Sequence, residues 1–394
     1  MLRIGHLAWI TGAVLAVGFG AAQLAGRSAR GGAACEDLGV AERRECYRRA
    51  LSARLTAGGV PAAVAALDSF AAANPWVAEH AHEYAHGVGI EAYRAGRPTD
   101  ITAMFAACGD GYSSGCRHGV IQAYFEAEDS VGRAEVESLC RPFKPPAPAA
   151  SRWVLFQCVH GMGHGLTMLY GHDLPRALAD CDLLADGWDR ESCYGGAFME
   201  NVINATAPHH PATQLAAQSH HHTAFQAIDP NDPLYPCSIM DSRYLHACYQ
   251  MQTSVMLHLN GGDIAGAARS CDRAPVSMRP VCYQSLGRDI TSYALRDPAK
   301  TAELCDQGSE SYRPACYTGA AKALVDWTAT TDAALEFCRI VVGDEPHGLG
   351  AGACYRALGE EIATLLAAAP ERARQCARAE HPVAVAACRA GAGI

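Results

Sequence analysis

The fold of this chain is decided by the stretch GDIAGAARSCDRAPVSMRPVCYQSLGRDITSYA, residues 262–294. Its first part, Asp263 to Cys271, predicts a short helix that ends at a cysteine. Residues Asp272 to Met278 contain a proline and predict a turn. Residues Arg279 to Ala294 predict a longer helix that carries Cys282. A disulfide between the two cysteines would join the helices of this hairpin.

The same spacing recurs along the chain. Three cysteine pairs each enclose ten residues, and a tyrosine follows the second cysteine of each: Cys237 and Cys248, Cys271 and Cys282, Cys305 and Cys316. The first cysteines lie 34 residues apart, and the spacing continues 33 residues on at Cys338 and 38 further at Cys376. A period of this length is typical of stacked helical repeats.

The chain of 394 residues contains 18 cysteines, an even number. Pairing by proximity gives nine disulfides: 35–46, 108–116, 140–158, 181–193, 237–248, 271–282, 305–316, 338–354 and 376–388. Nine pairs admit many other connectivities. So many regularly spaced cysteines indicate an oxidising compartment. No Cys-x-x-Cys occurs, which argues against zinc-ribbon, thioredoxin-type and covalent haem motifs.

The repeat length and the helix-turn-helix pattern resemble tetratricopeptide-type and Sel1-like solenoids over residues 35–390. The resemblance is one of architecture and carries no particular function. We therefore predict an all-α fold, a right-handed α-solenoid of helical hairpins cross-linked by disulfides within each repeat, preceded by one N-terminal transmembrane helix.

The N-terminal segment is apolar. Residues Leu7 to Ala25 carry no charge and are flanked by Arg3 on one side and by Arg27 and Arg30 on the other. This length of about 20 residues suits one bilayer span. We predict a signal anchor within residues 1–30 that leaves the body in the periplasm or the extracellular space; a cleaved signal peptide is the alternative.

Composition limits the class of partner. The net charge is −9, 49% of the residues are hydrophobic, and no basic run suggests nucleic-acid binding.

The chain divides into three parts after the N-terminal segment. We expect histidine-bearing helical repeats over residues 35–203 and regular repeats over 237–390. Between them lies an irregular insertion, 204–236, with the histidine runs 209–210 and 220–222.

Aligning the repeats on the second cysteine reveals a histidine pattern. Cys116-Arg-His118-Gly119 and Cys158-Val-His160-Gly161 superpose, and Tyr84-Ala-His86-Gly87 repeats the pattern with tyrosine in place of cysteine. Later repeats have Gln250, Gln284, Thr318 and Arg356 at the histidine position. Three consecutive repeats therefore differ from the others.

Residues four apart share a helix face, so His82 joins His86 and His164 joins His160. Adjacent helices lie about 8–10 Å apart, which would bring all five histidines together: His82, His86, His118, His160 and His164. Such imidazoles predict a site for one or two ions of zinc, copper, iron or nickel; a hydrogen-bonded histidine core is the alternative. The glycines after them predict close helix packing or close approach of a ligand.

Two glutamates are candidate acids. His82-Glu83-Tyr84-Ala85-His86 resembles the His-Glu-x-x-His motif of zinc metallopeptidases, which implies that His82 and His86 are ligands and Glu83 a general base. Glu200 lies seven residues after Cys193, and Asp289 and Glu361 hold the same position in later repeats. Glu200 is therefore a candidate acid or outer ligand, with a structural role equally open.

The sequence thus predicts an exported, membrane-anchored repeat protein with a histidine-ligated transition metal. If it is an enzyme, a metal-dependent hydrolase or an oxidoreductase would use these ligands. The alternatives are a scaffold that binds a protein or small-molecule partner without catalysis, and a zincin-like peptidase.

Overall fold

The computed structural model describes residues 35–96, 101–127, 131–147, 150–206, 225–343 and 349–394, where helices are joined by turns and loops and there are no strands. The all-α prediction is confirmed. Ten longer helices are α2 (Val40–Ala73), α4 (Ala81–Gly96), α6 (Gly115–Glu126), α8 (Arg152–Leu169), α10 (Gly187–Thr206), α12 (Leu245–Leu259), α14 (Arg279–Tyr293), α16 (Arg313–Thr328), α18 (Leu349–Leu365) and α20 (Pro382–Gly391).

Helices of 5 to 11 residues connect the longer ones, which have at least 12 residues apart from α20 with 10. They are α3 (Pro75–Glu79), α5 (Thr102–Cys108), α7 (Arg133–Leu139), α9 (Leu174–Cys181), α13 (Ile264–Cys271), α15 (Pro298–Cys305), α17 (Asp332–Val342) and α19 (Ala369–Ala377), with single 3₁₀ turns η1 (Tyr112–Ser114), η2 (Arg141–Phe143), η3 (Ser242–Tyr244) and η4 (Glu310–Tyr312). Several begin at an aspartate whose carboxylate accepts a backbone hydrogen bond, as Asp297 does from Lys300 at 2.7 Å.

All nine disulfides pair as proximity predicts, and no cysteine is free. Each joins a longer helix to the segment before it. Helix α4 is the exception, because Tyr84 stands where its neighbours have cysteine. Loops of 8 to 18 residues closed in this way each contribute about 2–3 kcal/mol on an entropic estimate.

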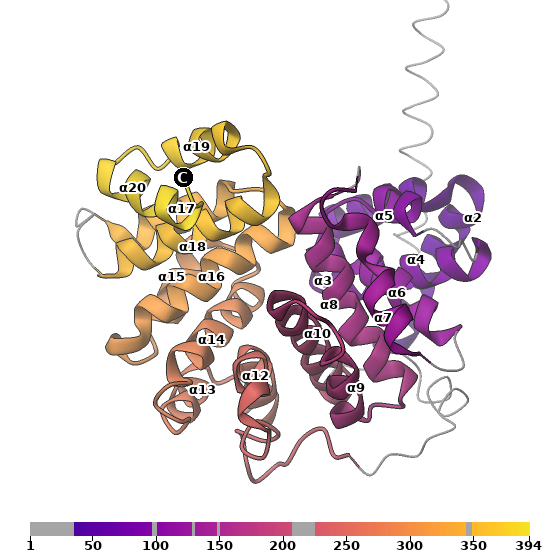
Figure 1. The fold of residues 1–394 in the computed structure, drawn as a ribbon, viewed down its shortest axis with the longest axis horizontal. Coiled ribbons are helices and arrows are strands. Elements are labelled where there is room, and N and C mark those ends of the chain that lie inside the picture. The colour runs from indigo at the N-terminus through magenta and orange to yellow at the C-terminus, as the bar shows by residue number, and fades with distance from the viewer. Residues whose placement is uncertain (1–34, 97–100, 128–130, 148–149, 207–224, 344–348) are drawn as a thin grey trace, which may run out of the picture.

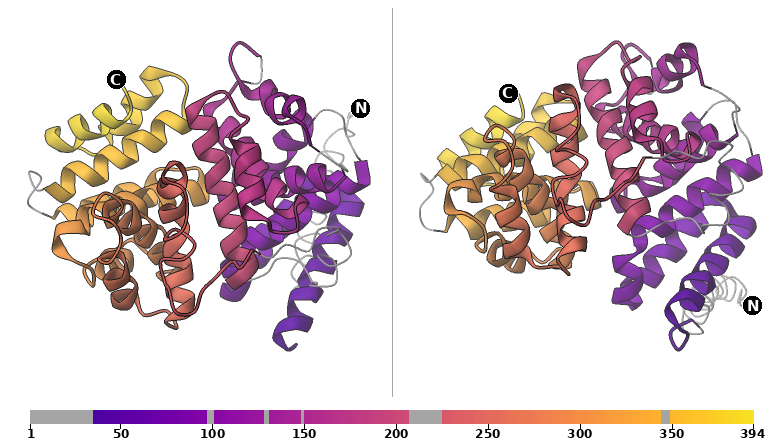
Figure 2. Two further views of the ribbon diagram at one scale, coloured as in Figure 1. Left: turned by 60° about the horizontal axis from the view of Figure 1, so that its bottom comes forward. Right: turned by 90° about the horizontal axis from the view of Figure 1, so that it is seen from below.

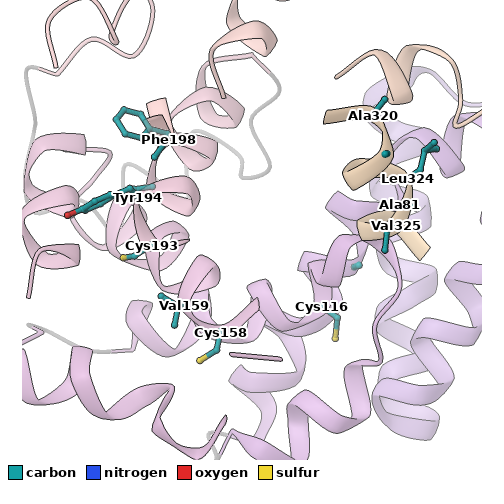
Figure 3. Close-up of a cluster of buried hydrophobic side chains, with 14 of the residues drawn as sticks. Ala81, Cys116, Cys158, Val159, Cys193, Tyr194, Phe198, Ala320, Leu324 and Val325 are labelled. Carbon is teal, nitrogen blue, oxygen red and sulfur yellow. The ribbon is translucent and has the colours of Figure 1, made fainter. Parts of the chain in front are cut away.

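Successive longer helices pack against one another in chain order, so the N-terminal half (α2–α10) lies beside the C-terminal half (α12–α20) in Figures 1 and 2. The halves also touch through α8 with α18 and through η1 with α16. Buried side chains of α16, among them Leu324 and Val325, lie near Ala81 at the start of α4 (Figure 3). A right-handed solenoid remains a prediction.

Four pairs of longer helices meet backbone to backbone through glycine. In α4 and α6, a Cβ on Gly89 would lie 1.9 Å from the carbonyl oxygen of Cys116, and one on Gly119 would lie 2.1 Å from that of His86. The predicted close packing is thus confirmed at these glycines, and only glycine fits there. The same reciprocal contact, here called a glycine contact, joins α8 to α10, α14 to α16 and α18 to α20.

The glycine contacts give the two halves the same plan. Each half has one longer helix without such a contact, α2 or α12, followed by two glycine-contact pairs. The glycines of the first half recur about 200 residues later: Gly89, Gly119, Gly163 and Gly196 correspond to Gly287, Gly319, Gly359 and Gly391. Residues at the same distance from the second cysteine can therefore be compared between halves.

Within the described residues, one helix is long and apolar enough to cross a membrane, α2. It belongs to the folded body, because Tyr47, Leu51 and Leu67 are buried in the core and the helix bends at Gly58 and Gly59. The predicted anchor, Leu7 to Ala25, and the histidine runs 209–210 and 220–222 lie outside the described residues.

Candidate metal centre

Four helices, α4, α6, α8 and α10, surround a cluster that contains all five predicted histidines. Ring centroids lie 4.6 Å apart for His82 and His86, 5.5 Å for His86 and His118, 5.2 Å for His118 and His160, and 5.1 Å for His160 and His164. Four of the rings are buried and His82 is half-buried. The helical spacing inferred from the cysteine alignment thus brings these side chains together.

Hydrogen bonds fix the tautomers of the two histidines on α4. His82 Nδ1 lies 2.6 Å from the carbonyl oxygen of Tyr112, and His86 Nδ1 lies 2.9 Å from Gln122 Oε1. Gln122 presents its oxygen to His86 because its Nε2 donates to Glu200 Oε2 at 3.3 Å. Oxygens of this kind only accept, so each Nδ1 carries the hydrogen and each Nε2 carries a lone pair.

The same logic applies on α6 and α8. His118 Nε2 donates to Gln157 Oε1 at 2.9 Å, and His164 Nδ1 donates to Glu200 Oε2 at 2.8 Å. Their other nitrogens, His118 Nδ1 and His164 Nε2, are buried and have no hydrogen-bond partner among the described residues. Buried polar atoms without partners are uncommon and indicate a strained or binding site.

Two lone pairs face each other between His82 and His86. His82 Nε2 and His86 Nε2 lie 3.0 Å apart, and the ligand atoms of His82, His86 and His118 all lie within 4.8 Å of one another. Nitrogens about 2.0–2.1 Å from a tetrahedral ion lie about 3.3 Å apart, so His118 would have to approach by up to about 1.5 Å. These three side chains could therefore hold a metal ion.

The electrostatics of the site favour neutral imidazoles. Burial lowers the pKa of His82 to about 4 and that of His164 to about 3. Burial also holds the pKa of His118 and of His160 well below the ordinary value, even though a hydrogen bond to the Ser192 backbone acts in the opposite direction on His160. A neutral imidazole is the form that binds metals.

A strained turn supplies the partner of His82. Tyr112, Ser113 and Ser114 have φ of 56°, 48° and 56°, and such left-handed residues cost roughly 1–3 kcal/mol each. Contacts of Tyr112 hold this turn: its hydroxyl donates to Asp68 at 2.6 Å, and its ring packs edge-on against Trp327 of the C-terminal half. The orientation of His82 thus depends on both halves.

The two predicted glutamates occupy different places. Glu200 is buried behind the cluster and bonds His164 and Gln122. Glu83 faces α2, where it lies 3.5 Å from Arg44 Nε, and burial raises its pKa despite that arginine. Glu200 therefore orients the histidines from the outside, as carboxylates often do around metal ligands.

Sequence reasoning did not identify the glutamines or the Tyr112 carbonyl. Gln122 lies four residues after His118 and Gln157 three before His160, so helical spacing could have placed both near the cluster. The carbonyl carries no such signal.

The C-terminal half lacks this chemistry. The residues at the positions of His86, His118, His160 and His164 are Gln284, Thr318, Arg356 and Glu360. Lys322, at the position of Gln122, forms an ion pair with Glu360 at 2.7 Å. The same plan is thus stabilised by charged pairs in one half, while the other half carries imidazoles.

Comparison of the chain with protein-family models, with curated proteins and with solved structures gives no significant match.

Proposed function

We propose that this protein is exported, anchored in the membrane by its N-terminal segment, and binds a transition metal through His82 Nε2, His86 Nε2 and His118. Zinc, copper or iron would suit these ligands. His164 and His160 would supply further ligands to this ion or to a second one. Glu200 would hold His164 in its metal-binding tautomer.

One observation carries the proposal, namely the approach of His82 Nε2 to His86 Nε2 at 3.0 Å. Both nitrogens carry lone pairs, because both Nδ1 atoms donate to oxygen. Two lone pairs at this distance repel unless a cation lies beside them. A proton is disfavoured near neutral pH, since the pKa of His82 is lowered to about 4. A metal ion is the cation that fits.

The chemistry of such a site is hydrolytic or oxidative. Three imidazoles leave coordination positions open, where an ion would serve as a Lewis acid or exchange electrons. Zincin-like peptidase activity is the second candidate: Glu83 follows His82 directly, and burial raises its pKa, which is the direction that favours a general base.

The test is elemental analysis of the full chain purified from an oxidising compartment. We expect about one equivalent of metal or more in the native protein, and a loss of at least tenfold when His86, His118 and His160 are all replaced by alanine. The matched control replaces His246, His258 and His381, which lie outside the cluster, and should keep the metal. Equal metal content in all three proteins would refute the proposal and favour a scaffold.

Three further variants separate the metal proposals. Glu83→Gln should retain the metal; if it also abolishes peptide hydrolysis, the zincin-like reading is supported. Retention of metal by a variant lacking His118 and His160, with loss on removing His82, would point to the same reading.

A further inference from the structure

A cavity of about 570 Å³ lies between α2 and α4, within the size range of small-molecule sites. Six apolar residues line it: Val40, Ala41, Leu51, Leu55, Val88 and Ile90. His86 and Glu83 also form part of its wall. The α2–α4 groove, as we call this cavity, therefore adjoins the candidate metal centre.

The groove is open because small and apolar residues lie where the C-terminal half has a long polar one. A Cβ on Gly87 would meet nothing within 4 Å. Ile90 of α4 corresponds to Arg288 of α14, six residues after the tyrosine or cysteine of each helix. The Arg288 guanidinium fills the gap between α12 and α14, where it donates to the carbonyl oxygen of Gln250 at 2.6 Å and to Ser254 Oγ at 2.8 Å.

Helix α2, on the other side of the groove, is also more apolar than its counterpart α12 at the equivalent position. Leu51 of α2 corresponds to Thr253 of α12, whose hydroxyl bonds Ser285 at 2.6 Å and Asp289 at 2.8 Å. A polar network thus closes the gap in one half, whereas aliphatic side chains border an open one in the other. Apolar walls favour a ligand that buries hydrocarbon.

Three arginines also line the groove, and each lies beside a carboxylate. Arg44 lies 3.5 Å from Glu83, Arg48 lies 3.0 Å from Glu91, and Arg94 lies 2.5 Å from Glu126. Arg48 also bonds Glu45 at 2.8 Å. Because the arginines already have carboxylate partners, a charged ligand would gain little here, and an uncharged one avoids the cost of desolvating an ion.

The position of the groove indicates where such a ligand would come from. Val40, 64% exposed, and Ala41 line it at the start of α2. They follow Cys35 closely, and Cys35 is tied to Cys46 of the same helix. The apolar segment of the predicted anchor ends at Ala25, ten residues before Cys35, so this end of the body would lie near the bilayer.

We infer that the α2–α4 groove binds an uncharged lipophile drawn from the membrane and presents it to the metal centre beside His86. This inference rests on the proposed function, which supplies the membrane anchor and the metal. The groove is observed in the structure and does not depend on that proposal. The lipophile would lie along the aliphatic residues of α2 and α4, with its polar end towards His86 and Glu83.

The test uses the full chain in phosphatidylcholine vesicles that contain a diazirine-bearing diacylglycerol, a neutral photoactivatable lipid. After irradiation, mass spectrometry should place adducts on peptides of α2 and α4. Ile90→Arg copies the residue of the C-terminal half, and Gly87→Leu fills the open space; each should reduce these adducts at least tenfold. Ile340→Arg, at an exposed site on α17, is the control and should leave them unchanged.

Metal content and circular dichroism of the same samples separate the possible outcomes. Loss of adducts with metal and helicity retained supports the inference. Adducts on α2 and α4 that persist in both groove variants would overturn the inference. Stronger labelling by an anionic diazirine fatty acid than by the neutral lipid would also overturn it. If the groove is labelled but the protein binds no metal, the groove is a lipophile site and only the proposed metal function is refuted.

Discussion

Replacing Gly119 by alanine should disrupt the proposed metal centre, and Gly319 provides its matched control. A Cβ at Gly119 would lie 2.1 Å from the carbonyl oxygen of His86, and one at Gly319 would lie 1.8 Å from that of Gln284. Ordinary contact begins at 3.4 Å, so in the first case α6 must move from α4 by about 1.3 Å. That shift would move His118 further from His82 and His86, which it must already approach to share an ion, and metal–ligand distances tolerate only about 0.2 Å.

The two variants should destabilise the protein to a similar degree. Overpacking costs about 1–3 kcal/mol, and these sites lie at the upper end because the obstructing atoms are backbone. Alanine restores about 1 kcal/mol through its higher helix propensity. We therefore expect a net loss of about 2 kcal/mol for each variant in urea unfolding of the metal-free protein.

Metal affinity should separate them. Isothermal titration with zinc should show at least tenfold weaker binding for Gly119→Ala and native binding for Gly319→Ala. If both variants bind as the native protein does while losing stability, the close approach of α4 and α6 does not set the ligand geometry. Equal weakening in both would mean that affinity follows global stability.

Three further predictions concern charge, pH and cross-linking. Glu200→Gln keeps the size of the side chain and removes the charge behind His164, so metal affinity should fall 10- to 100-fold in the same titration; native affinity would exclude a role for His164. The metal-free protein should lose stability as the pH falls from 6.5 to about 4, because the unfolded chain then binds protons that His82 and His164 of the folded protein do not. The expected loss in the free energy of unfolding is about 1.4 kcal/mol per pH unit for each such histidine. Replacing both by glutamine should make that dependence less steep in urea unfolding at each pH, and His118 and His160 should account for what is left. Cys305→Ser with Cys316→Ser should cost about 2–3 kcal/mol and leave metal binding intact, since this disulfide lies in the other half.

The local structure and the residues of the histidine cluster could be predicted from the sequence. Each cysteine pair closes a single hairpin, so neighbours in the chain are also neighbours in space, and pairing by proximity gives the correct disulfides. The same regularity places His118 and His160 on equivalent helix faces. A spacing of four residues then adds His82 and His164.

Other features depend on contacts between distant segments. The glycine contacts join alternate helices into pairs, and nothing in one repeat states which neighbour Gly89 or Gly163 will meet. The bond from His82 to the Tyr112 carbonyl is set by a turn that Trp327 supports from the other half. The groove depends on which side chain occupies the gap between two helices: Ile90 leaves it open, whereas Arg288 bridges the equivalent gap in the C-terminal half.

The hairpin that carries His82 and His86 is the one without a disulfide. Helix α4 can therefore separate from its neighbours by breaking only packing and hydrogen bonds, while each adjoining longer helix stays covalently tied to its hairpin. Sub-global opening should have its lowest free energy at this helix. The rate of uptake and release of the proposed ion would then be set by the opening of α4. That rate would not depend on whether the disulfides elsewhere in the protein are oxidised or reduced.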